Sequence, residues 1–516
     1  MLEGATHLQN AEKADKIVEL AKRRGFFWPS YEIYGGASGF VTFGPLGSVL
    51  KRRIEDKFRA FYTRPLGITE IESSVILPSK VFEASGHVEH FKEPLTECTN
   101  CKRKFRADHL LQEQAKMSDT ETEKLTLTEL KDEIDKRKVR CPECNGILGE
   151  PKHFMTMFTT TIGPYSDAVG YGRPEAAQSI FVEFRRLWEL ARERLPFGIV
   201  QIGHALRNEI SPRQGPIRLR EFTIMDVEFF FDPEEPNCTQ LKDVENESLQ
   251  LVRAEAKLKG EKEPIIVTVK EALQKGYIKT EWHAYFMALA KRFLRELGVP
   301  DEKQRFMEKL DWEKAHYSAQ SFDQEIHLER WGWTEVSWHA YRTDYDLKKH
   351  MEFSGVDMRA FKEGRRFIPH VVEPSFGSDR LAYIAAEFAY QTKKDRAVLA
   401  FPRDLAPSQV GVYPLVSKDG LPEKALQLYQ ALVKEGFTVE YDESGSIGRR
   451  YARADEAGTP LGITIDYDTL KDNAVTIRDR DTWKQVRTPI DQLADLLTDY
   501  FLHKKEFEEL GRLIKG

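Results

Sequence analysis

The sequence predicts a multidomain chain of mixed α and β structure that ends in a separate α/β domain. Three observations lead to this fold class. The chain has 516 residues. A single hydrophobic core does not organise a chain of this length, so about two to four domains are expected. Two Cys-x-x-Cys pairs lie in a polar stretch between residues 98 and 144. From about residue 396, apolar strands alternate with helical segments, which is typical of an α/β domain.

Composition limits the class of protein. The chain is 41% hydrophobic and 31% charged, as in ordinary globular proteins. It contains no run of about 18 apolar residues, so no membrane span is expected. The N-terminal segment is polar and helical without an apolar signal region, so we expect a cytoplasmic location. A net charge of -6 argues against bulk attraction to nucleic acid, so a polyanionic partner would meet local basic patches.

The character of the chain changes several times along its length. Gly-rich turns and apolar runs come first, followed by the cysteine pairs and then by strands and helices with large aromatic residues. The charged, helix-prone segment 232–310 is interpreted as an insertion. Strand-like stretches then lead into a helix before the C-terminal domain. The predicted units are 1–97, 98–150, 151–231, 232–310, 311–395 and 396–516.

The stretch RNEISPRQGPIRLREF, residues 207–222, is rich in arginine. It is predicted to join two strands through a Pro/Gly loop, with Arg207 and Glu209 on one strand face. In the second strand, Asp226 and Glu228 share a face, while Val227, Phe229 and Phe231 point the other way. A planar guanidinium suits a phosphate, and adjacent carboxylates suit an amine, a ribose or a cation. A solvated sheet face with ion pairs explains the pattern equally well.

Three further stretches carry candidate residues. In HVVEPSFGSDRLAYIAA, residues 370–386, a strand ends at Glu373, Gly377 permits close backbone approach, and Arg380 lies in the first turn of a helix. In YGRPEAAQSIFVEF, Glu175 follows a proline before a short helix. In GWTEVSWHAYRTDYDL, Glu335 is suited to Mg²⁺. Taken singly, each stretch is explained as well by a helix start or by structural ion pairs.

The four paired cysteines predict a metal site. CTNC and CPEC supply Cys98, Cys101, Cys141 and Cys144. Four thiolates in two such knuckles suit tetrahedral Zn²⁺ in a closed, structural site. Free thiols are the alternative. Cys238 stands alone and is expected to be inert.

Taken together, these stretches resemble the class II aminoacyl-tRNA synthetases, and within that class the glycyl-tRNA synthetases of the archaeal/eukaryotic and homodimeric bacterial type. EIYGGASGFVTFGPLGSVLKRRIEDKF resembles the family's start and motif 1, RNEISPRQGPIRLREF motif 2, and EPSFGSDR motif 3. VFEASGHVEHF, RKFRADHL and GRPEAAQSIFVEF resemble segments that select the glycine family. GSIGRRYARADEAGTPLGITIDY is similar to the anticodon-binding domain. The resemblance covers nearly the whole chain.

The resemblance implies a fold and an activity. The fold would be an α+β catalytic domain, a class II antiparallel sheet flanked by helices. A zinc-ribbon-like insertion and a helical insertion would project from it, followed by a C-terminal α/β anticodon-binding domain. The enzyme would activate glycine with ATP to glycyl-adenylate, release pyrophosphate and transfer glycine to the 3′ end of tRNA(Gly). Its cofactors would be ATP, Mg²⁺ and structural Zn²⁺. Motif 1 with Pro45 would form a homodimer interface.

The resemblance also implies roles for individual residues. Arg207 would bind the α-phosphate and Arg380 the γ-phosphate, and these two residues with Glu209 would be catalytic. Glu335 would contact ATP through Mg²⁺. The predicted ATP site consists of Arg207, Asn208, Glu209, Arg218, Leu219, Phe222, Glu335, Val336, Gly377 and Arg380. The predicted glycine site consists of Glu175, Asp226, Glu373 and Ser375, with Arg106 nearby. In the C-terminal domain, Arg449, Arg450 and Arg453 would give a basic patch for RNA phosphates.

The sequence departs from the family at three places. Asp226 stands where the family usually has Glu, RPEAAQSIF replaces RPETAQGIF, and WHAYR, residues 338–342, replaces GIADR or GCADR. These changes leave open whether Trp338 and His339 narrow the glycine pocket or only pack. Two alternatives remain: a synthetase-like nucleic-acid-binding protein without aminoacylation, and a class II synthetase for threonine, proline or histidine. The retained motif residues disfavour the first, and the RPE and EASGH segments disfavour the second.

Overall fold

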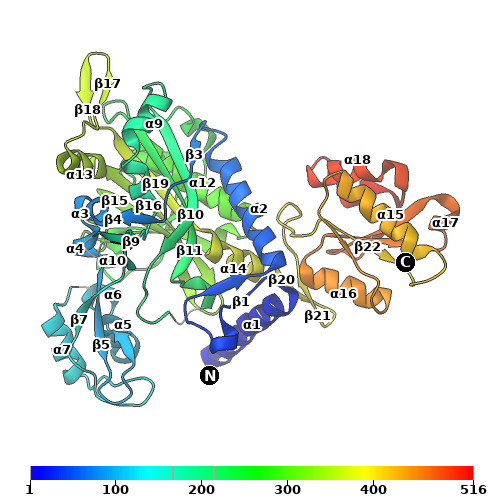
Figure 1. The fold of residues 1–516 in the computed structure, drawn as a ribbon, viewed down its shortest axis with the longest axis horizontal. Helices are drawn as coiled ribbons and strands as arrows, with labels where there is room; N and C mark the ends of the chain where they lie inside the picture. Colours follow the sequence, from blue (N-terminus) through cyan, green and yellow to red (C-terminus); the bar gives the residue numbers. More distant parts are fainter. Residues whose placement is uncertain (1, 123, 165–167, 213–214, 515–516) are drawn as a thin grey trace.

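A nine-stranded sheet forms the centre of the computed structural model, which describes residues 2–122, 124–164, 168–212 and 215–514 (Figure 1). Neighbouring strands run antiparallel except for two pairs, β10 with β3 and β12 with β14. In sheet order, the strands are β13 (Ile265–Thr268), β12 (Ser248–Val252), β14 (Gln304–Glu308), β15 (Gln320–Leu328), β16 (Gly332–Thr343), β19 (His370–Gly377), β11 (Glu221–Phe231), β10 (Phe197–Leu206) and β3 (Thr69–Ile71).

Strand β11 shows why the sheet has two different faces. Val227, Phe229 and Phe231 belong to the main hydrophobic core, whereas Phe230 packs in a second cluster on the other side. Because side chains alternate along a strand, Asp226 and Glu228 point to the same side as Phe230. The alternation predicted for this strand is confirmed, and it directs two carboxylates away from the main core.

Helices cover both faces of the sheet. On the main-core face lie α2, α12 and α14. In α2, Leu50, Ile54 and Phe58 recur at four-residue spacing and are buried, as one face of an amphipathic helix requires. The second face is covered by α8, α9 and α13. The bounds of these helices are α2 (Pro45–Tyr62), α8 (Ala177–Phe181), α9 (Phe184–Leu190), α12 (Glu281–Glu296), α13 (Tyr345–Ser354) and α14 (Ser378–Ala389).

Residues 232–310 are placed differently from the projecting helical insertion that we expected. They supply β12, β13 and β14 to one edge of the main sheet and α12 to its face. Helix α12 is buried along most of its length, including Trp282, Phe286 and Phe293, which pack in the main core. The average composition of the segment is charged because of its flanks, so the composition did not reveal the apolar helix. The other predicted domain boundaries stay predictions.

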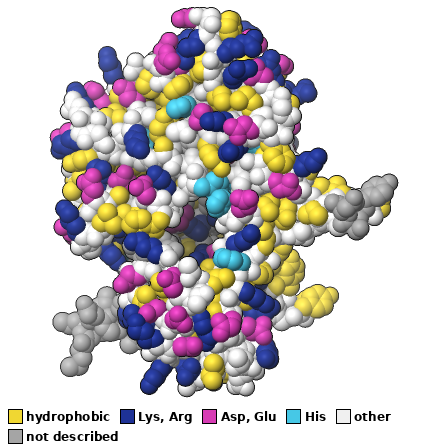
Figure 2. Space-filling view, turned by 90° about the vertical axis from the view of Figure 1, so that its left-hand side faces the viewer, with side chains coloured by type: hydrophobic (Ala, Val, Ile, Leu, Met, Phe, Trp, Pro, Cys, Tyr) yellow, Lys and Arg dark blue, Asp and Glu magenta, His cyan; other side chains and the backbone are white. Residues whose placement is uncertain are grey.

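The paired cysteines lie in a small unit that we call the cysteine module, residues 92–155. It has its own hydrophobic core, with Phe105, Leu111 and Ile134 among the buried residues. In Figure 1 it lies at the lower left, and Figure 2 shows that face, where a hollow lies between the upper body and the lower lobe. Its elements are β5 (Lys92–Glu97), β6 (Lys104–Arg106), β7 (Lys152–Met155), α5 (Ala107–Ala115), α6 (Asp119–Thr122) and α7 (Leu127–Lys136).

The C-terminal part forms a second, six-stranded mixed sheet, to the right in Figure 1. Helices α15 (Leu421–Lys434), α16 (Ile447–Ala457) and α18 (Ile490–Phe501) accompany it. Its strands are β23 (Val439–Tyr441), β22 (Val410–Pro414), β24 (Leu461–Ile465), β25 (Ala474–Asp479), β26 (Gln485–Pro489) and β27 (Arg512–Leu513). The predicted alternation of strands and helices is confirmed here.

The basic patch predicted on this part is largely absent. Arg450 is 2% exposed and donates hydrogen bonds to the backbone carbonyls of Pro414, Glu443 and Gly445. Arg453 pairs with Asp442. Of the three predicted cations, only Arg449 is exposed without a described partner. The prediction of a three-arginine patch is therefore wrong, because two of the side chains hold α16 against neighbouring loops.

The remaining elements are short apart from α1, which has 23 residues. None of the described helices combines the length and apolarity needed to cross a membrane. These elements are α1 (Leu2–Arg24), β1 (Phe27–Pro29), β2 (Val41–Phe43), β4 (Ile76–Pro78), α3 (Ser79–Ala84), α4 (His87–His90), β8 (Thr159–Thr161), β9 (Val169–Gly172), α10 (Ala254–Leu258), α11 (Val269–Gln274), β17 (Ala360–Lys362), β18 (Arg365–Phe367), β20 (Tyr390–Lys393), β21 (Arg396–Leu399) and α17 (Thr469–Asp472).

Candidate active site

A cavity of about 530 Å³ brings together most of the residues predicted to bind a nucleotide. We call it the arginine pocket. The loop between β10 and β11, strand β16 and the start of α14 all contribute to its wall. A larger and more open hollow of about 760 Å³ lies along α2, and its described lining contains none of the predicted residues. The predicted residues in the arginine pocket are Arg207, Glu209, Arg218, Leu219, Phe222, Glu335, Val336, Ser375, Gly377 and Arg380.

The loop that carries these arginines is longer than predicted. Strand β10 ends at Leu206 and β11 begins at Glu221, so Arg207 and Glu209 lie beyond the strand instead of on its face. The Arg207 Nε donates to the Pro174 carbonyl at 3.1 Å, and the Arg218 Nε lies 3.0 Å from a Glu209 carboxylate oxygen. The first contact ties the loop to the segment that precedes α8, and the second is internal to the loop. The predicted loop residues 213–214 lie outside the described residues.

Three guanidinium groups converge in the arginine pocket. The Arg380 Nε donates to the Ile217 carbonyl at 2.9 Å, and another of its nitrogens donates to the Glu335 carbonyl. Burial, together with the positive charges of Arg218 and Arg207, lowers the pKa of Arg380. The pocket therefore holds several positive charges close together, and a bound polyanion would stabilise them.

Aromatic side chains line the rest of the arginine pocket. The Arg207 guanidinium lies over the Phe222 ring, with its central carbon 5.5 Å from the ring centroid. Trp331, Trp333 and Trp338 also line the cavity, and the sequence prediction did not assign them to it. Flat aromatic walls suit the face of a purine. The pocket can thus hold both an aromatic base and phosphate groups.

His339 and Trp338 have different environments. Trp338 borders the arginine pocket, whereas His339 is fully buried against Phe306 and Phe376. Burial lowers the pKa of His339 well below its ordinary value. His339 therefore packs as a neutral core residue, and the question left open by the WHAYR segment is resolved for it.

A second group of charged residues surrounds Arg342, which is fully buried. Its nitrogens lie 2.9 Å from Glu373, 2.8 Å from Asp346 and 3.4 Å from Glu175, in each case measured to a carboxylate oxygen. The guanidinium also stacks over Tyr317 at 3.7 Å from the ring centroid. We call Glu175, Asp346 and Glu373, arranged around Arg342, together with the neighbouring Asp226, the acidic cluster.

Glu175 is ionised at the edge of this cluster. Burial opposes its charge, but His87 and Arg342 outweigh burial and lower the pKa of Glu175 well below its ordinary value. The His87 Nε2 lies 3.3 Å from the Glu175 carboxylate, and Ser85 holds the opposite ring nitrogen at 2.7 Å. Gln178 donates to the same carboxylate at 3.1 Å. Glu175 thus presents a fixed negative charge.

Ser375 joins the acidic cluster to the arginine pocket. Its hydroxyl donates to Asp226, the residue directly opposite it in the β11–β19 pairing, and Ser375 also lines the arginine pocket. The Ala176 backbone N–H donates to the other Asp226 oxygen at 2.7 Å. Burial raises the pKa of Asp226 to about 6. A carboxylate-rich region and an arginine-rich region therefore meet at Ser375.

Two predicted residues lie away from their predicted positions. Arg106 pairs with Glu93 and Asp108 in the cysteine module and borders a small cavity next to Glu209, so the structure does not bring it to the acidic cluster. Asn208 donates its backbone N–H to the Thr156 carbonyl at 2.6 Å and is not among the described lining of the arginine pocket. Their predicted roles in binding stay untested.

Sequence reasoning did not assign several residues of the acidic cluster. Arg342 and Asp346 stood out only by their spacing in WHAYRTDYD, which a structural ion pair explains equally well. His87 lies in the EASGH segment, and Gln178 lies in RPEAAQ. Their convergence depends on three segments that are distant in the chain, so spacing alone carried no signal.

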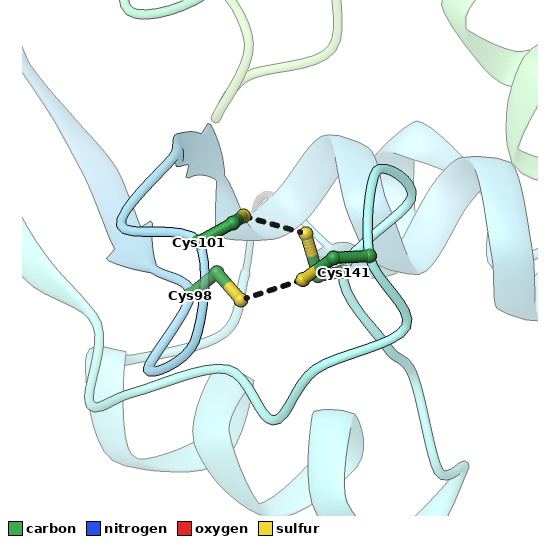
Figure 3. Close-up of side chains that lie close together, drawn as sticks. Cys98, Cys101 and Cys141 are labelled. Atoms are coloured by element: carbon green, nitrogen blue, oxygen red, sulfur yellow. Dashed lines mark hydrogen bonds between the residues drawn. The ribbon is translucent and has the colours of Figure 1, made fainter.

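The four paired cysteines form a tight cluster in the cysteine module (Figure 3). All four sulfur atoms lie within 4.8 Å of one another. The Cys98 and Cys144 sulfurs are 3.5 Å apart, and the Cys101 and Cys141 sulfurs are 3.6 Å apart. Tetrahedral Zn–S bonds of about 2.3 Å place sulfurs about 3.8 Å apart. The donor set and its spacing therefore fit one tetrahedral metal ion.

Comparisons with known proteins agree with this architecture. The anticodon binding domain family model matches residues 409–500. A glycine–tRNA ligase from Aeropyrum pernix is 45% identical, covering 97% of this chain and 99% of that protein. One from Methanocaldococcus jannaschii is 42% identical, covering 94% and 98%. A prolyl-tRNA synthetase structure from Cryptosporidium parvum, complexed with L-proline and AMP, has a TM-score of 0.55 at 14% identity and covers 95% of this chain and 76% of that one. The predicted class II fold is confirmed.

Proposed function

The chain belongs to the glycine–tRNA ligase family, and we propose that the acidic cluster and the arginine pocket are the two halves of its glycyl-adenylate site. The enzyme activates glycine with ATP to glycyl-adenylate and then transfers glycine to the 3′ end of tRNA(Gly). One observation carries the proposal for the site: Ser375 belongs to both halves, so an amino group and a phosphate chain would meet there.

The acidic cluster suits the ammonium group of glycine. Its four carboxyl groups outnumber the cations beside them, which are Arg342, His87 next to Glu175 and Arg173 near Asp226, so an added cation is favourable. Glu175, Asp226 and Glu373 are 6%, 0% and 4% exposed, which leaves little space beside the ammonium for a side chain. Exclusion by bulk would then select glycine over alanine and serine.

The arginine pocket suits ATP. A glycine carboxylate oxygen would attack the α-phosphorus, the bond from that phosphorus to the bridging oxygen would break, and pyrophosphate would leave. Arg207 and Arg380 would stabilise the charge on the phosphate oxygens by fixed position. Phe222 would stack on the adenine ring. No general base is needed, because the nucleophile is already a carboxylate.

Glu335 is the residue that we propose for Mg²⁺. Its side chain is exposed in the wall of the arginine pocket, and a carboxylate oxygen is a ligand that Mg²⁺ prefers. The ion, when bound with ATP, would neutralise phosphate charge.

The 3′ end of tRNA would reach this site past the β10–β11 loop. Glu209 borders the arginine pocket and a small cavity, and Ser211 borders that cavity and a groove of about 450 Å³. The groove is lined by Lys102, Arg103 and Lys104 of the cysteine module, all exposed. We propose that these cations contact backbone phosphates of the incoming single strand.

We also propose that the enzyme is a homodimer and that it is located in the cytoplasm. Ile33 and Tyr34, which precede the motif 1 helix α2, are 87% and 84% exposed. Large apolar side chains with this exposure support an interface with a second copy.

We propose Zn²⁺ as the ion held by Cys98, Cys101, Cys141 and Cys144. Replacing Cys98 with serine removes one thiolate ligand. We therefore expect elemental analysis to find less zinc in the purified variant than in the unchanged protein, and we expect the variant to melt at a lower temperature. Cys238→Ser is the matched control, because Cys238 is also a buried cysteine but lies outside the cluster. Equal zinc content in both variants and in the unchanged protein would contradict the assignment.

Glycine-dependent ATP–pyrophosphate exchange tests the proposed function, followed by charging of tRNA(Gly) with labelled glycine. Exchange with glycine, and none with alanine or serine, is the expected result. Absence of exchange with every amino acid, in folded protein supplied with Mg²⁺, would overturn the activity. Exchange with a larger amino acid would overturn the assignment of the glycine pocket.

A further inference from the structure

Glu228 is a buried carboxyl group that the proposed reaction does not use. It lies two residues after Asp226 on β11 and therefore points to the same side of the sheet as the acidic cluster. Its side chain is 0% exposed, and neither of its carboxyl oxygens has a hydrogen-bond partner among the described residues. A buried polar group without a partner is costly, so this one needs an explanation.

The strand register places Glu228 directly opposite Glu373. Strand β11 pairs with β19 with Asp226 facing Ser375 and Phe229 facing Val372. Continuing the same antiparallel register between these pairs sets Glu228 against Glu373. Residues directly opposite in an antiparallel pair have Cβ atoms about 4.5–5.5 Å apart, so the two carboxyl groups are neighbours.

Apolar residues flank this pair of carboxyl groups on the neighbouring strands. Ile199 of β10 faces Glu228, and Ala340 of β16 faces Glu373. Neither residue offers a donor or a charge. The charged groups that face the pair are Arg342, Asp226 and Asp346, together with Glu175 beside Glu373. Arg342 donates to Glu373 at 2.9 Å, whereas Glu228 has no described donor.

Two adjacent buried carboxyl groups do not both ionise without a large cost, so they share a proton. Burial and the nearby carboxylates raise the pKa of Glu373 to about 8. Arg342 donates to Glu373 and not to Glu228, so the shared proton is favoured on Glu228. Burial and the negative charge of Glu373 raise the pKa of Glu228 well above its ordinary value, in agreement with this assignment. A protonated Glu228 has an O–H donor, and the acceptor that the register places opposite it is Glu373.

We propose that Glu228 is a positioning residue for ammonium recognition, which stays protonated and donates a hydrogen bond to Glu373. A carboxylate offers about four lone-pair positions. With Arg342 on one side and Glu228 on the other, Glu373 is fixed in orientation and keeps acceptor capacity for the glycine ammonium. The inference rests on the proposed function, because it assumes that Glu373 binds glycine.

Two substitutions at Glu228 separate a neutral donor from a charge. Glu228→Gln keeps a donor of the same size, so we expect its KM for glycine in pyrophosphate exchange to stay within about threefold of the unchanged enzyme. Glu228→Leu removes the donor, and we expect its KM for glycine to rise about 10- to 100-fold. In both variants the KM for ATP should stay unchanged, because Glu228 lies on the glycine side.

The outcomes are distinct from failure of the proposed function, which would appear as no exchange in the unchanged enzyme. If exchange is present and Glu228→Gln raises the KM for glycine as much as Glu228→Leu does, Glu228 acts as an ionised group and the inference fails. Unchanged glycine KM in both variants also overturns it.

A spectroscopic measurement is independent of whether Glu228→Leu folds. Infrared spectra of the unchanged enzyme at neutral pH should contain the carbonyl band of a buried protonated carboxyl group, and this band should disappear in Glu228→Gln. Its persistence in Glu228→Gln would contradict the proton assignment.

Discussion

Replacing Arg342 with methionine is expected to lower the free energy of unfolding by about 3–5 kcal/mol, because removing one partner of a buried ion pair leaves uncompensated charge. Among the described ion pairs, Glu373 and Asp346 each pair with Arg342 and with no other cation. Glu175 pairs with Arg342 and with His87. Urea denaturation measures the change. Glycine-dependent exchange should be lost with it, since the cluster would no longer be ordered.

Arg359→Met is the matched control for this prediction. Arg359 also pairs with a carboxylate, Asp357 at 2.8 Å, but its side chain is 44% exposed. An exposed ion pair is screened by water and contributes little, so this substitution should change the free energy of unfolding little. Arg342→Lys, which keeps the charge but loses the planar fork, should fall between the two. Equal stability of Arg342→Met and Arg359→Met would contradict the structural role of Arg342.

Arg380→Gln is expected to reduce the rate of glycine-dependent pyrophosphate exchange by about 10²–10³-fold, the typical loss when one preorganised donor to a developing charge is removed. Arg380 is held by the Ile217 and Glu335 carbonyls at the wall of the arginine pocket, with Arg207 and Arg218 nearby. Steady-state exchange kinetics measure the effect, with the melting temperature checked in parallel.

Arg453→Gln serves as the control for Arg380→Gln. Arg453 pairs with Asp442 in the C-terminal part of the chain, far in sequence from the pocket, so exchange should be unchanged. If Arg380→Gln retains full exchange activity, the arginine pocket is not where ATP reacts.

The arginine pocket was largely predictable from the sequence, and the acidic cluster only in part. Arg207, Glu209 and Arg380 were assigned to an ATP site by the resemblance to class II motifs 2 and 3, since their local patterns alone fit structural ion pairs equally well. Arg342 and His87 carried little signal, because their role depends on distant segments meeting at a buried point. Arg106 shows the reverse, since a motif resemblance placed it with glycine while its contacts lie in the cysteine module.

The fold was predictable where periodicity is clean. The alternation in β11 correctly separated Val227 and Phe229 from Asp226. It failed at the ends of the arginine hairpin, where β10 stops at Leu206 and loop contacts decide the geometry. The prediction that residues 232–310 project from the catalytic domain failed for another reason. The average composition of the segment is charged, although its helix α12 is apolar and buried.

The most direct test of the glycyl-adenylate site is a crystal structure with a non-hydrolysable glycyl-adenylate analogue, in which a sulfamoyl group replaces the phosphate. We expect the ammonium between Glu175 and Glu373 near Ser375, the sulfamoyl group beside Arg207, and the adenine ring on Phe222. An analogue bound with its ammonium outside the acidic cluster, or in the hollow along α2, would contradict this assignment.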